Sequence, residues 1–298
     1  MNVKLRHIEE ADKDSYIELE KETWVEVNLL EDENEADKVW VNTFTMKTEI
    51  TYTILGNNEI CGFCSIKHID QDEKEISIEI FKCFQHQGVG YQALKILLEI
   101  CEKEYRMKSV KSKVYPDNYP SILLMRKVGA MPYGIERNVA VEEQFEKEFQ
   151  ENNRELISDN LSKVANIFRV DKEKMLSQIL CFKIDIPIRK IQFDLCIDGD
   201  VDYKKEIETK AMRFMYQKMI NSLKTILISC DGSKESLNEE IQKLISQYEK
   251  VLKTSAIITG VRPIDFPFKI FFTCKVFIFQ LLKTYCPLTH KIINLIIV

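Results

Sequence analysis

The chain has 298 residues, a length that as a prior suggests two structural units. Hydrophobic residues make up 45% and charged residues 30%, which is typical of a globular protein and argues against a disordered chain. The formal net charge of −5 argues against a general nucleic-acid binder, which needs a basic surface to displace phosphate counterions. Nine cysteines at scattered spacings and an N-terminus without an apolar stretch predict a cytoplasmic protein with reduced thiols.

The first half of the chain predicts alternating strands and helices. Runs rich in β-branched residues predict strands, at 3–7, 50–55, 60–69, 75–83, 109–115 and 133–141. Amphipathic patterns predict helices between them, at 11–24, 34–46, after Gly90 and at 120–127. Strands predominate early and one strand–loop–helix crossover lies in the middle. This order predicts an α/β (α+β) fold, a mixed sheet flanked by helices.

The second half predicts a mainly helical unit. Residues 142–180 carry three short helical patterns, the last ending at Leu180. Residues 182–202 are expected to be irregular or extended, because a proline interrupts any helix there. Apolar residues recur every three or four positions over 212–230 and 237–251, on either side of a short turn. They predict an antiparallel helical hairpin.

These changes in composition divide the chain into three parts. Residues 1–140 form the first unit, residues 141–265 a helical extension and residues 266–298 a hydrophobic tail. The tail holds no Asp or Glu, but its recurring lysines argue against a membrane span, which needs about 20 apolar residues. We expect the tail to dock on the helical unit, with a frameshifted gene end as the alternative.

One loop carries a pattern that points to chemistry. Gln85-His86-Gln87-Gly88-Val89-Gly90-Tyr91 leads from a predicted strand into a helix. Glycines let the backbone curl so that successive N–H groups converge on an anion, and the helix adds its positive N-terminal end. The segment lacks both the GxGxxG pattern and the Gly-Lys-Ser/Thr of a P-loop. It therefore predicts a phosphate-binding turn of another kind.

This loop resembles the Gln/Arg-x-x-Gly-x-Gly/Ala loop of the GNAT superfamily of acetyl-CoA-dependent N-acetyltransferases. Three other segments resemble family landmarks in the same order: Leu5-Arg6 with Glu10-Ala11-Asp12, Ile60-Cys61-Gly62-Phe63, and Tyr115 to Gly129 with its Asn118-x-x-Ser121. The resemblance covers residues 1–140 and is greatest to the branch that includes ribosomal-protein alanine acetyltransferases. Two residues depart from the pattern. Met125 stands where many members have a tyrosine that protonates the thiolate, and Ala130 replaces a phenylalanine.

The resemblance implies transfer of an acetyl group from acetyl-CoA to a primary amine, which could be a protein N-terminus, a peptide or a small amine. Backbone N–H groups from Gln85 to Tyr91 would hold the pyrophosphate. The edge at Phe81–Cys83 would pair with the pantetheine amides like an added strand and polarise the thioester carbonyl. Asn118 would hydrogen-bond cofactor or acceptor, and Ser121 would lie near the thiol.

Glu79 is the expected general base. An amine is mostly protonated at neutral pH, so a base must remove its proton before it can attack. Glu79 lies on an otherwise apolar strand, six residues before the loop. A structural, ion-paired glutamate is the alternative interpretation.

The sequence also bears on a metal site, on other partners and on an alternative function. Cys61-x-x-Cys64 has no second cysteine pair at zinc-finger spacing, so no metal site is predicted. No nucleic acid or membrane span is expected, and a homo-oligomer stays open. The alternative function is a catalytically weak acetyl-CoA-binding module whose helical part recruits a partner, which Met125 and Ala130 favour.

Overall fold

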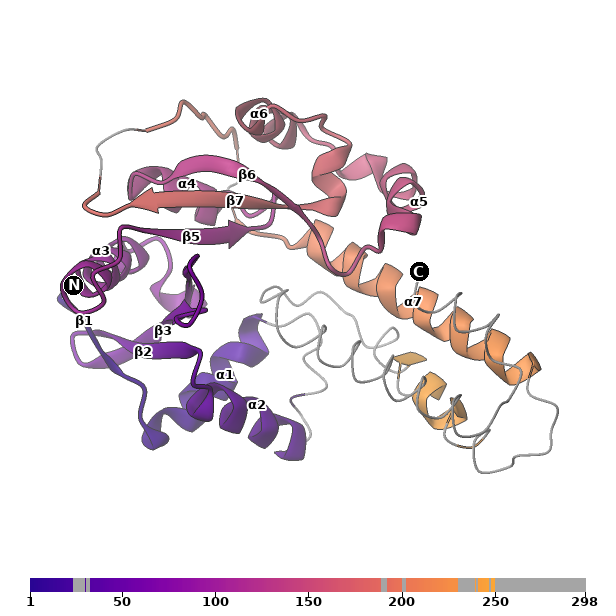
Figure 1. Cartoon of the computed structure of the whole chain (residues 1–298), viewed down its shortest axis with the longest axis horizontal. Helices are drawn as coiled ribbons and strands as arrows, with labels where there is room; N and C mark the ends of the chain where they lie inside the picture. Colours follow the sequence, from indigo (N-terminus) through magenta and orange to yellow (C-terminus); the bar gives the residue numbers. More distant parts are fainter. Residues whose placement is uncertain are drawn as a thin grey trace.

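The computed structural model describes residues 1–23, 30, 33–188, 192–199, 202–229, 239, 241–246 and 248–249. Its centre is a seven-stranded sheet in the order β1-β2-β3-β4-β5-β7-β6 (Figure 1). Neighbouring strands run antiparallel, except β4 and β5, which are parallel. The strands are β1 (Val3–His7), β2 (Glu49–Gly56), β3 (Glu59–Lys67), β4 (Glu75–Ile80), β5 (Ser109–Val114), β6 (Met131–Arg137) and β7 (Gln178–Asp185). The predicted mixed sheet is confirmed.

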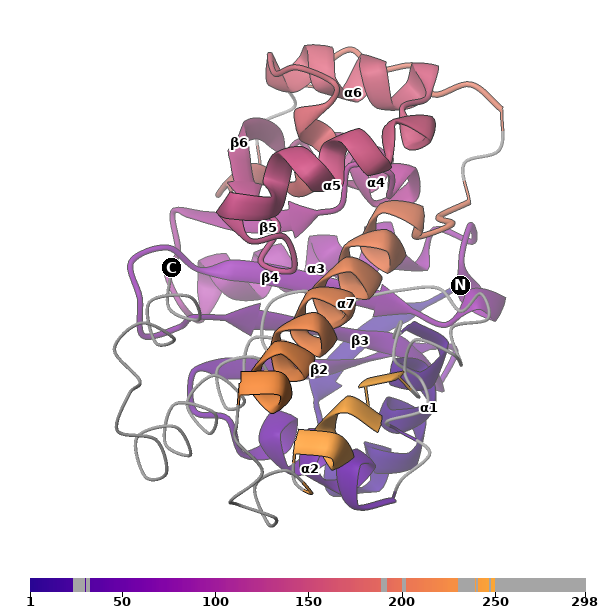
Figure 2. The same cartoon turned by 90° about the vertical axis from the view of Figure 1, so that its right-hand side faces the viewer.

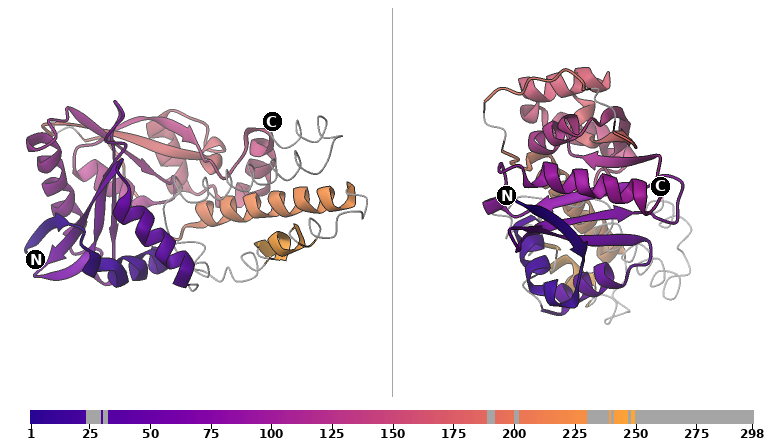
Figure 3. Two further views of the ribbon diagram at one scale, coloured as in Figure 1. Left: turned by 60° about the horizontal axis from the view of Figure 1, so that its bottom comes forward. Right: turned by 90° about the vertical axis from the view of Figure 1, so that its left-hand side faces the viewer.

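Two sets of helices cover opposite faces of the first four strands (Figure 3). Phe63 of β3 packs in one hydrophobic cluster with α1 (Lys13–Thr23) and α2 (Glu33–Thr45). The next residue, Cys64, belongs to the cluster that contains α3 (Val89–Lys103). Because successive side chains of a strand point to opposite faces, α1 and α2 cover one face and α3 the other.

The strand next to β5 comes from far along the chain. β7 pairs antiparallel with β5 on one side and with β6 on the other. The chain between β6 and β7 forms α5 (Glu146–Asn152) and α6 (Asp159–Phe168), which lie beyond the edge of the sheet in Figure 1. The sheet therefore includes a segment that lies past residue 140.

The position of β7 in the sheet corrects the prediction for the second half of the chain. A helix was expected to end at Leu180 and irregular chain to follow it, whereas Gln178–Asp185 is a strand. Residues 178–182 are all buried, because helices or neighbouring chain cover both faces of the strand. A short, continuous apolar run does not distinguish a buried strand from a buried helix. The expected limit of the first unit at residue 140 thus does not coincide with the edge of the sheet.

A long helix, α7 (Glu206–Ser229), crosses in front of the sheet and extends beyond it (Figure 2). Its stripe of buried side chains includes Met212, Met215 and Leu223, which confirms the first arm of the predicted hairpin. The rings of Tyr216 and Tyr248 lie 5.5 Å apart, so the helical residues near 241–249 pack against it. The turn at residues 231–233 and the tail at 266–298 lie outside the described residues. No helix in the described part is long and apolar enough to cross a membrane.

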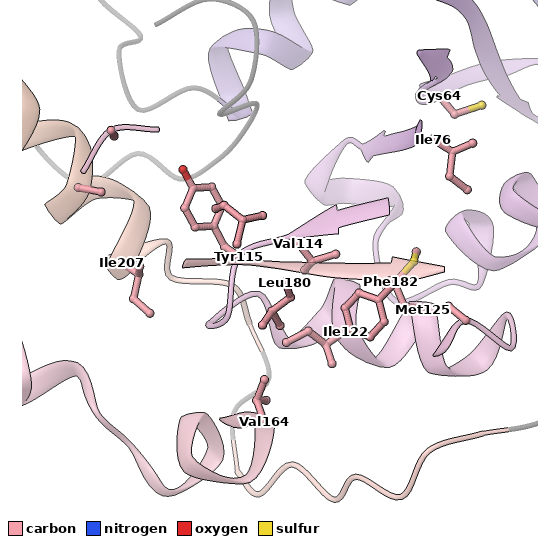
Figure 4. Close-up of a cluster of buried hydrophobic side chains, with 14 of the residues drawn as sticks. Cys64, Ile76, Val114, Tyr115, Ile122, Met125, Val164, Leu180, Phe182 and Ile207 are labelled. Atoms are coloured by element: carbon pink, nitrogen blue, oxygen red, sulfur yellow. The ribbon is translucent and has the colours of Figure 1, made fainter. Parts of the chain in front are cut away.

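One hydrophobic core joins the extension to the sheet. Side chains of β5, β7 and α4 (Tyr119–Lys127) meet there, among them Val114, Ile122 and Phe182, and Ile207 adds the first turn of α7 (Figure 4). Met125 is 2% exposed in the same core. The start of α7 is therefore fixed against β5, β7 and α4.

Candidate functional site

β4 and β5 separate along their length and open a cavity. In the described sheet their pairing is limited to Glu75 and Lys111, whereas β4 pairs with β3 from Glu75 to Ile80. Beyond this pair, Ser77–Ile80 and Ser112–Tyr115 line a cavity of about 1320 Å³. The gap leaves backbone groups of β4 facing an open space that an extended ligand could fill.

The glycine loop borders this cavity at the start of α3. Gly88 is the N-cap of the helix with a φ of 80°, a left-handed conformation that favours glycine. No side chain in the described residues caps the helix there. The first N–H groups of a helix have no intrahelical partner, so those of Val89, Gly90 and Tyr91 can bind an anion. The expected phosphate-binding turn has the geometry for that role.

The absence of a side chain at Gly90 keeps part of the cavity open. A Cβ placed on this residue would lie 3.4 Å from Leu124, 3.8 Å from Ile80 and 3.9 Å from Ile78. All three residues line the cavity, so a side chain at Gly90 would fill part of it. Lys127, whose Nζ lies 4.6 Å from the centre of the Tyr91 ring, adds positive charge beside the helix start. These features fit the pyrophosphate of acetyl-CoA.

The polar side chains of the loop hold the loop in place. Gln85 Nε2 donates to the carbonyl oxygen of Ile80 (2.9 Å), and Gln87 Nε2 donates to that of Cys83 (2.7 Å). His86 Nε2 lies 3.3 Å from a carboxylate oxygen of Asp202, in the extension. The backbone of the loop, rather than these side chains, therefore faces an incoming anion.

The structure corrects the role expected for Phe81–Cys83. β4 ends at Ile80, and the N–H of Phe81 donates to the carbonyl oxygen of Cys61 (3.0 Å). Lys82–Phe84 then form a short 3₁₀ helix, so the chain is not an open extended edge. Phe81 packs against the α1–α2 cluster and Cys83 is exposed, and neither lines the cavity. The open edge belongs to Ser77–Ile80 instead.

Glu79 faces away from the glycine loop. It pairs with Phe63, and so shares the face that α1 covers, whereas Ile78 and Ile80 point toward Gly90. Its side chain is buried, with the residue 7% exposed, and its Oε2 lies 3.5 Å from Thr23 Oγ1, whose proton is donated to the Leu19 carbonyl oxygen (2.7 Å). The cavity is lined by Glu79 and by the loop, so a carboxylate and an anion-binding turn lie on two sides of one strand.

Asn118 and Ser121 meet at the start of α4. Asn118 Oδ1 accepts a hydrogen bond from the backbone N–H of Ser121 (3.1 Å), which makes Asn118 the N-cap of this helix. Both residues line the cavity. The contact that Asn118 makes is therefore structural, and it orients the wall of the cavity opposite β4.

The extension returns to this site between residues 202 and 210. Lys205 Nζ donates to the carbonyl oxygen of Thr23, the last residue of α1 (3.2 Å). Glu208 is 4% exposed and accepts from the hydroxyl of Tyr203 (2.9 Å). Burial lowers the pKa of Lys205 to about 8 and raises the pKa of Glu208 to about 7. Two ionisable groups of the extension are thus buried at the site.

Asp117 ties the extension to the turn between β5 and α4. Its Oδ2 accepts from the N–H of Ile207 in the first turn of α7 (3.0 Å), and burial raises its pKa to about 6. Sequence reasoning missed all five residues of this group: Thr23, Asp117, Tyr203, Lys205 and Glu208. Only Asp117 had a signal, because it lies inside the Tyr115–Asn118 motif.

The described part of the chain holds no group of three or more His, Cys, Asp or Glu residues that could bind a metal ion.

Comparison with known proteins identifies the domain. Residues 2–131 match the family described as the acetyltransferase (GNAT) domain. No protein of curated function matches the sequence. A solved spermidine N-acetyltransferase from Vibrio cholerae, in complex with CoA and spermine, is 12% identical, and the match covers 62% of this chain and 96% of that one, with a TM-score of 0.44.

A chimera of the Vibrio cholerae spermidine N-acetyltransferase with hSSAT is also similar. It is 14% identical, with the same coverage of 62% and 96% and a TM-score of 0.45. The domain match agrees with the cavity, the uncapped start of α3 and the space at Gly90. Residues 2–131 are thus a GNAT acetyltransferase domain, and the chain that carries it is an acetyl-CoA-dependent acyltransferase.

Proposed function

We propose that this site moves the acetyl group of acetyl-CoA to a primary amine, with Glu79 as the general base. One observation carries the proposal: the anion-binding turn of α3 and the buried carboxylate of Glu79 border one cavity from opposite faces of β4. Donor and acceptor would approach from these two faces and meet in the gap between β4 and β5.

On the donor side, the chain offers backbone groups and charge. Acetyl-CoA, when bound, supplies an acetyl group activated as a thioester. The N–H groups of Val89 to Tyr91 would hold its pyrophosphate, with Lys127 as a further positive charge. The open edge of Ser77–Ile80 would pair with its amide groups in the manner of an added strand.

On the acceptor side, Glu79 would take the proton of the amine. The hydroxyl oxygen of Thr23, the last residue of α1, lies 3.5 Å from this carboxylate. The acceptor could be a protein N-terminus, a peptide or a small amine. The resemblance to ribosomal-protein alanine acetyltransferases makes a peptide with an N-terminal alanine the first acceptor to try. Met125 is a core residue and has no proton to give to a departing thiolate.

Release of free thiol from acetyl-CoA tests the proposal. The assay uses the full chain and a panel of acceptors: peptides with free N-termini, lysine peptides, polyamines and small monoamines. We expect thiol release that depends on one class of amine and on enzyme concentration. Tight binding of acetyl-CoA without release by any amine would contradict the proposal and favour a binding module.

A further inference from the structure

Lys205 lies where the proposed function requires an acceptor amine, and we infer that the enzyme acetylates this lysine of its own chain. The inference rests on the proposed acetyl transfer. It depends on the position of the amine beside Glu79, on the anchoring of its segment across the cavity and on its backbone conformation.

The first argument is position. Lys205 Nζ donates to the carbonyl oxygen of Thr23 (3.2 Å), and the hydroxyl oxygen of the same threonine lies 3.5 Å from Glu79 Oε2. One residue thus links the ammonium group to the carboxylate that we propose as the base. Lys205 is 6% exposed and lines the same cavity as Gly88 and Gly90. The amine is therefore inside the space in which acetyl transfer would take place.

The second argument is the course of the segment. Asp202 pairs with His86 of the glycine loop (3.3 Å), and Ile207 is held by Asp117 (3.0 Å). Lys205 lies between these two anchors. The chain therefore runs from the loop toward the end of α1 and places the Lys205 side chain at the site.

The third argument is conformation. Lys205 adopts a φ of 55°, in the left-handed region that costs a residue with a side chain about 1–2 kcal/mol. Such strain persists where surrounding contacts hold the residue in place, and it is concentrated at functional sites. Lys204, its exposed neighbour in the same segment, offers a matched comparison.

Burial of Lys205 Nζ outweighs the carboxylates around it, which favour the charged amine. The charged groups around Nζ are Glu79 from β4, Glu208 from α7, Asp117 from the β5–α4 turn and Lys82 after β4, with the Tyr203 ring centre 5.3 Å away. Burial lowers the pKa of Lys205 to about 8, so roughly a tenth of the amine is neutral at pH 7. An exposed lysine is almost entirely protonated at that pH.

The reaction balances with groups already named. Glu79 takes one proton from the Lys205 ammonium, and the freed electron pair attacks the carbonyl carbon of the thioester. The C–N bond forms while the C–S bond breaks, and the second proton lost by Nζ goes to the departing thiolate. The products are free CoA and an uncharged acetyl-lysine at position 205.

Mass spectrometry of the full chain tests the inference. The protein is incubated with acetyl-CoA, and the acetylated positions are mapped on peptides for wild type, Lys205→Arg, Lys204→Arg and Glu79→Gln. We expect one acetyl group on Lys205 in wild type and in Lys204→Arg, and none at that position in Lys205→Arg. The first-order rate constant of this acetylation should saturate as the acetyl-CoA concentration rises, and it should be independent of protein concentration. It should fall at least about 10²-fold in Glu79→Gln, because the base is lost.

A second readout needs no turnover. NMR of protein with ¹³Cε-labelled lysine follows the titration of each amine without acetyl-CoA, and Lys205→Arg assigns the signal. We expect Lys205 to titrate near pH 8, below the ordinary pKa of a lysine. A Lys205 titration at the ordinary value for lysine, about 10.4, would overturn the inference.

The amine panel, run on the same preparation, separates two kinds of failure. If panel amines are acetylated while Lys205 stays unmodified, the self-acetylation is refuted and the proposed function stands. If neither is acetylated although acetyl-CoA binds, the proposed function itself fails. Equal acetylation of Lys204 and Lys205, unaffected by Glu79→Gln, would indicate unassisted chemistry and refute the inference.

Discussion

The ammonium group of Lys205 donates a hydrogen bond to the carbonyl oxygen of Thr23, 182 positions earlier in the chain. This contact joins the last residue of α1 to the segment that precedes α7. The wall of the cavity beside Glu79 is therefore built from both halves of the chain. A GNAT domain that ended near residue 140 would lack this wall and the seventh strand.

Truncation tests the dependence on the second half. A chain that ends at Val141 loses β7, which is the partner of β6 and covers the edge of β5. We expect it to aggregate or unfold and not to bind acetyl-CoA, because the apolar faces of β5 and α4 become exposed. A chain that ends at Glu249 keeps every described residue and serves as the control. Circular dichroism and calorimetry measure both, and a folded, acetyl-CoA-binding 1–141 fragment would contradict the account.

Gly90→Val tests the donor side. The new side chain would meet Leu124, Ile80 and Ile78 and fill part of the cavity. The added side chain would occupy space that the ligand needs, so affinity for acetyl-CoA should fall roughly 10- to 100-fold in calorimetry, which is about 1.4–2.8 kcal/mol of binding free energy. Gly134→Val on β6 is the control, since nothing lies within 4 Å of an added Cβ there. Equal affinities of the two variants would remove the loop from the binding site.

Two variants of Asn118 distinguish a helix-capping role of this residue from a direct contact with the ligand. Asn118→Ala removes the hydrogen bond to the Ser121 N–H and should lower the free energy of unfolding by about 1 kcal/mol. Asn118→Asp keeps an accepting oxygen and should restore stability in urea titrations. If acetyl-CoA affinity also recovers in the aspartate variant, the cap explains the residue. Unchanged stability in the alanine variant would disprove the capping role.

Glu208→Gln tests the burial of this carboxyl group through the pH dependence of protein stability. Burial raises the pKa of Glu208 from 4.5 to about 7, so the native state holds a proton that the unfolded chain releases. Its contribution to stability is present below pH 4.5 and is lost as the pH rises through 7. The stability of wild type relative to Glu208→Gln should therefore fall across this window.

Urea midpoints at several pH values between 4.5 and 7 measure this difference. The pKa of Lys205, lowered to about 8, affects stability in the opposite sense and above this window, where its contribution is lost as the pH falls through 8. Glu151→Gln, at an exposed position, is the control for the loss of one carboxylate. A constant difference between wild type and Glu208→Gln would mean that this carboxyl is not buried in solution.

Local patterns predicted the first half of the fold well. The strand at residues 3–7 has the predicted bounds, and the alternation that includes Ile76 and Ile78 correctly predicted β4. The loop at Gln85–Tyr91 was recognisable because its chemistry needs glycines and a helix start in one short segment. The role expected for Phe81–Cys83 was wrong, because only the 3₁₀ helix at Lys82–Phe84 shows that the strand has already ended.

The second half could not be read from local patterns for a physical reason. β7 is buried in the sheet, so its sequence lacks the alternation that marks a half-exposed strand. Lys205 and Glu208 stand in a run of charges of the kind that usually lies in water. Their burial depends on contacts with Thr23 and Tyr203, and the first of these spans most of the chain. Only the assembled fold reveals that these two residues are buried.

The most direct test of the proposed catalysis compares wild type with Glu79→Gln once an amine acceptor has been found. The substitution keeps the shape of the side chain and removes its capacity to take a proton, while the glycine loop on the other face of β4 is untouched. We predict that kcat/KM falls about 10²–10⁴-fold, that the acidic limb of the pH–rate profile flattens and that acetyl-CoA affinity is unchanged. Superimposable pH–rate profiles for the two proteins would contradict the role of Glu79 as the base.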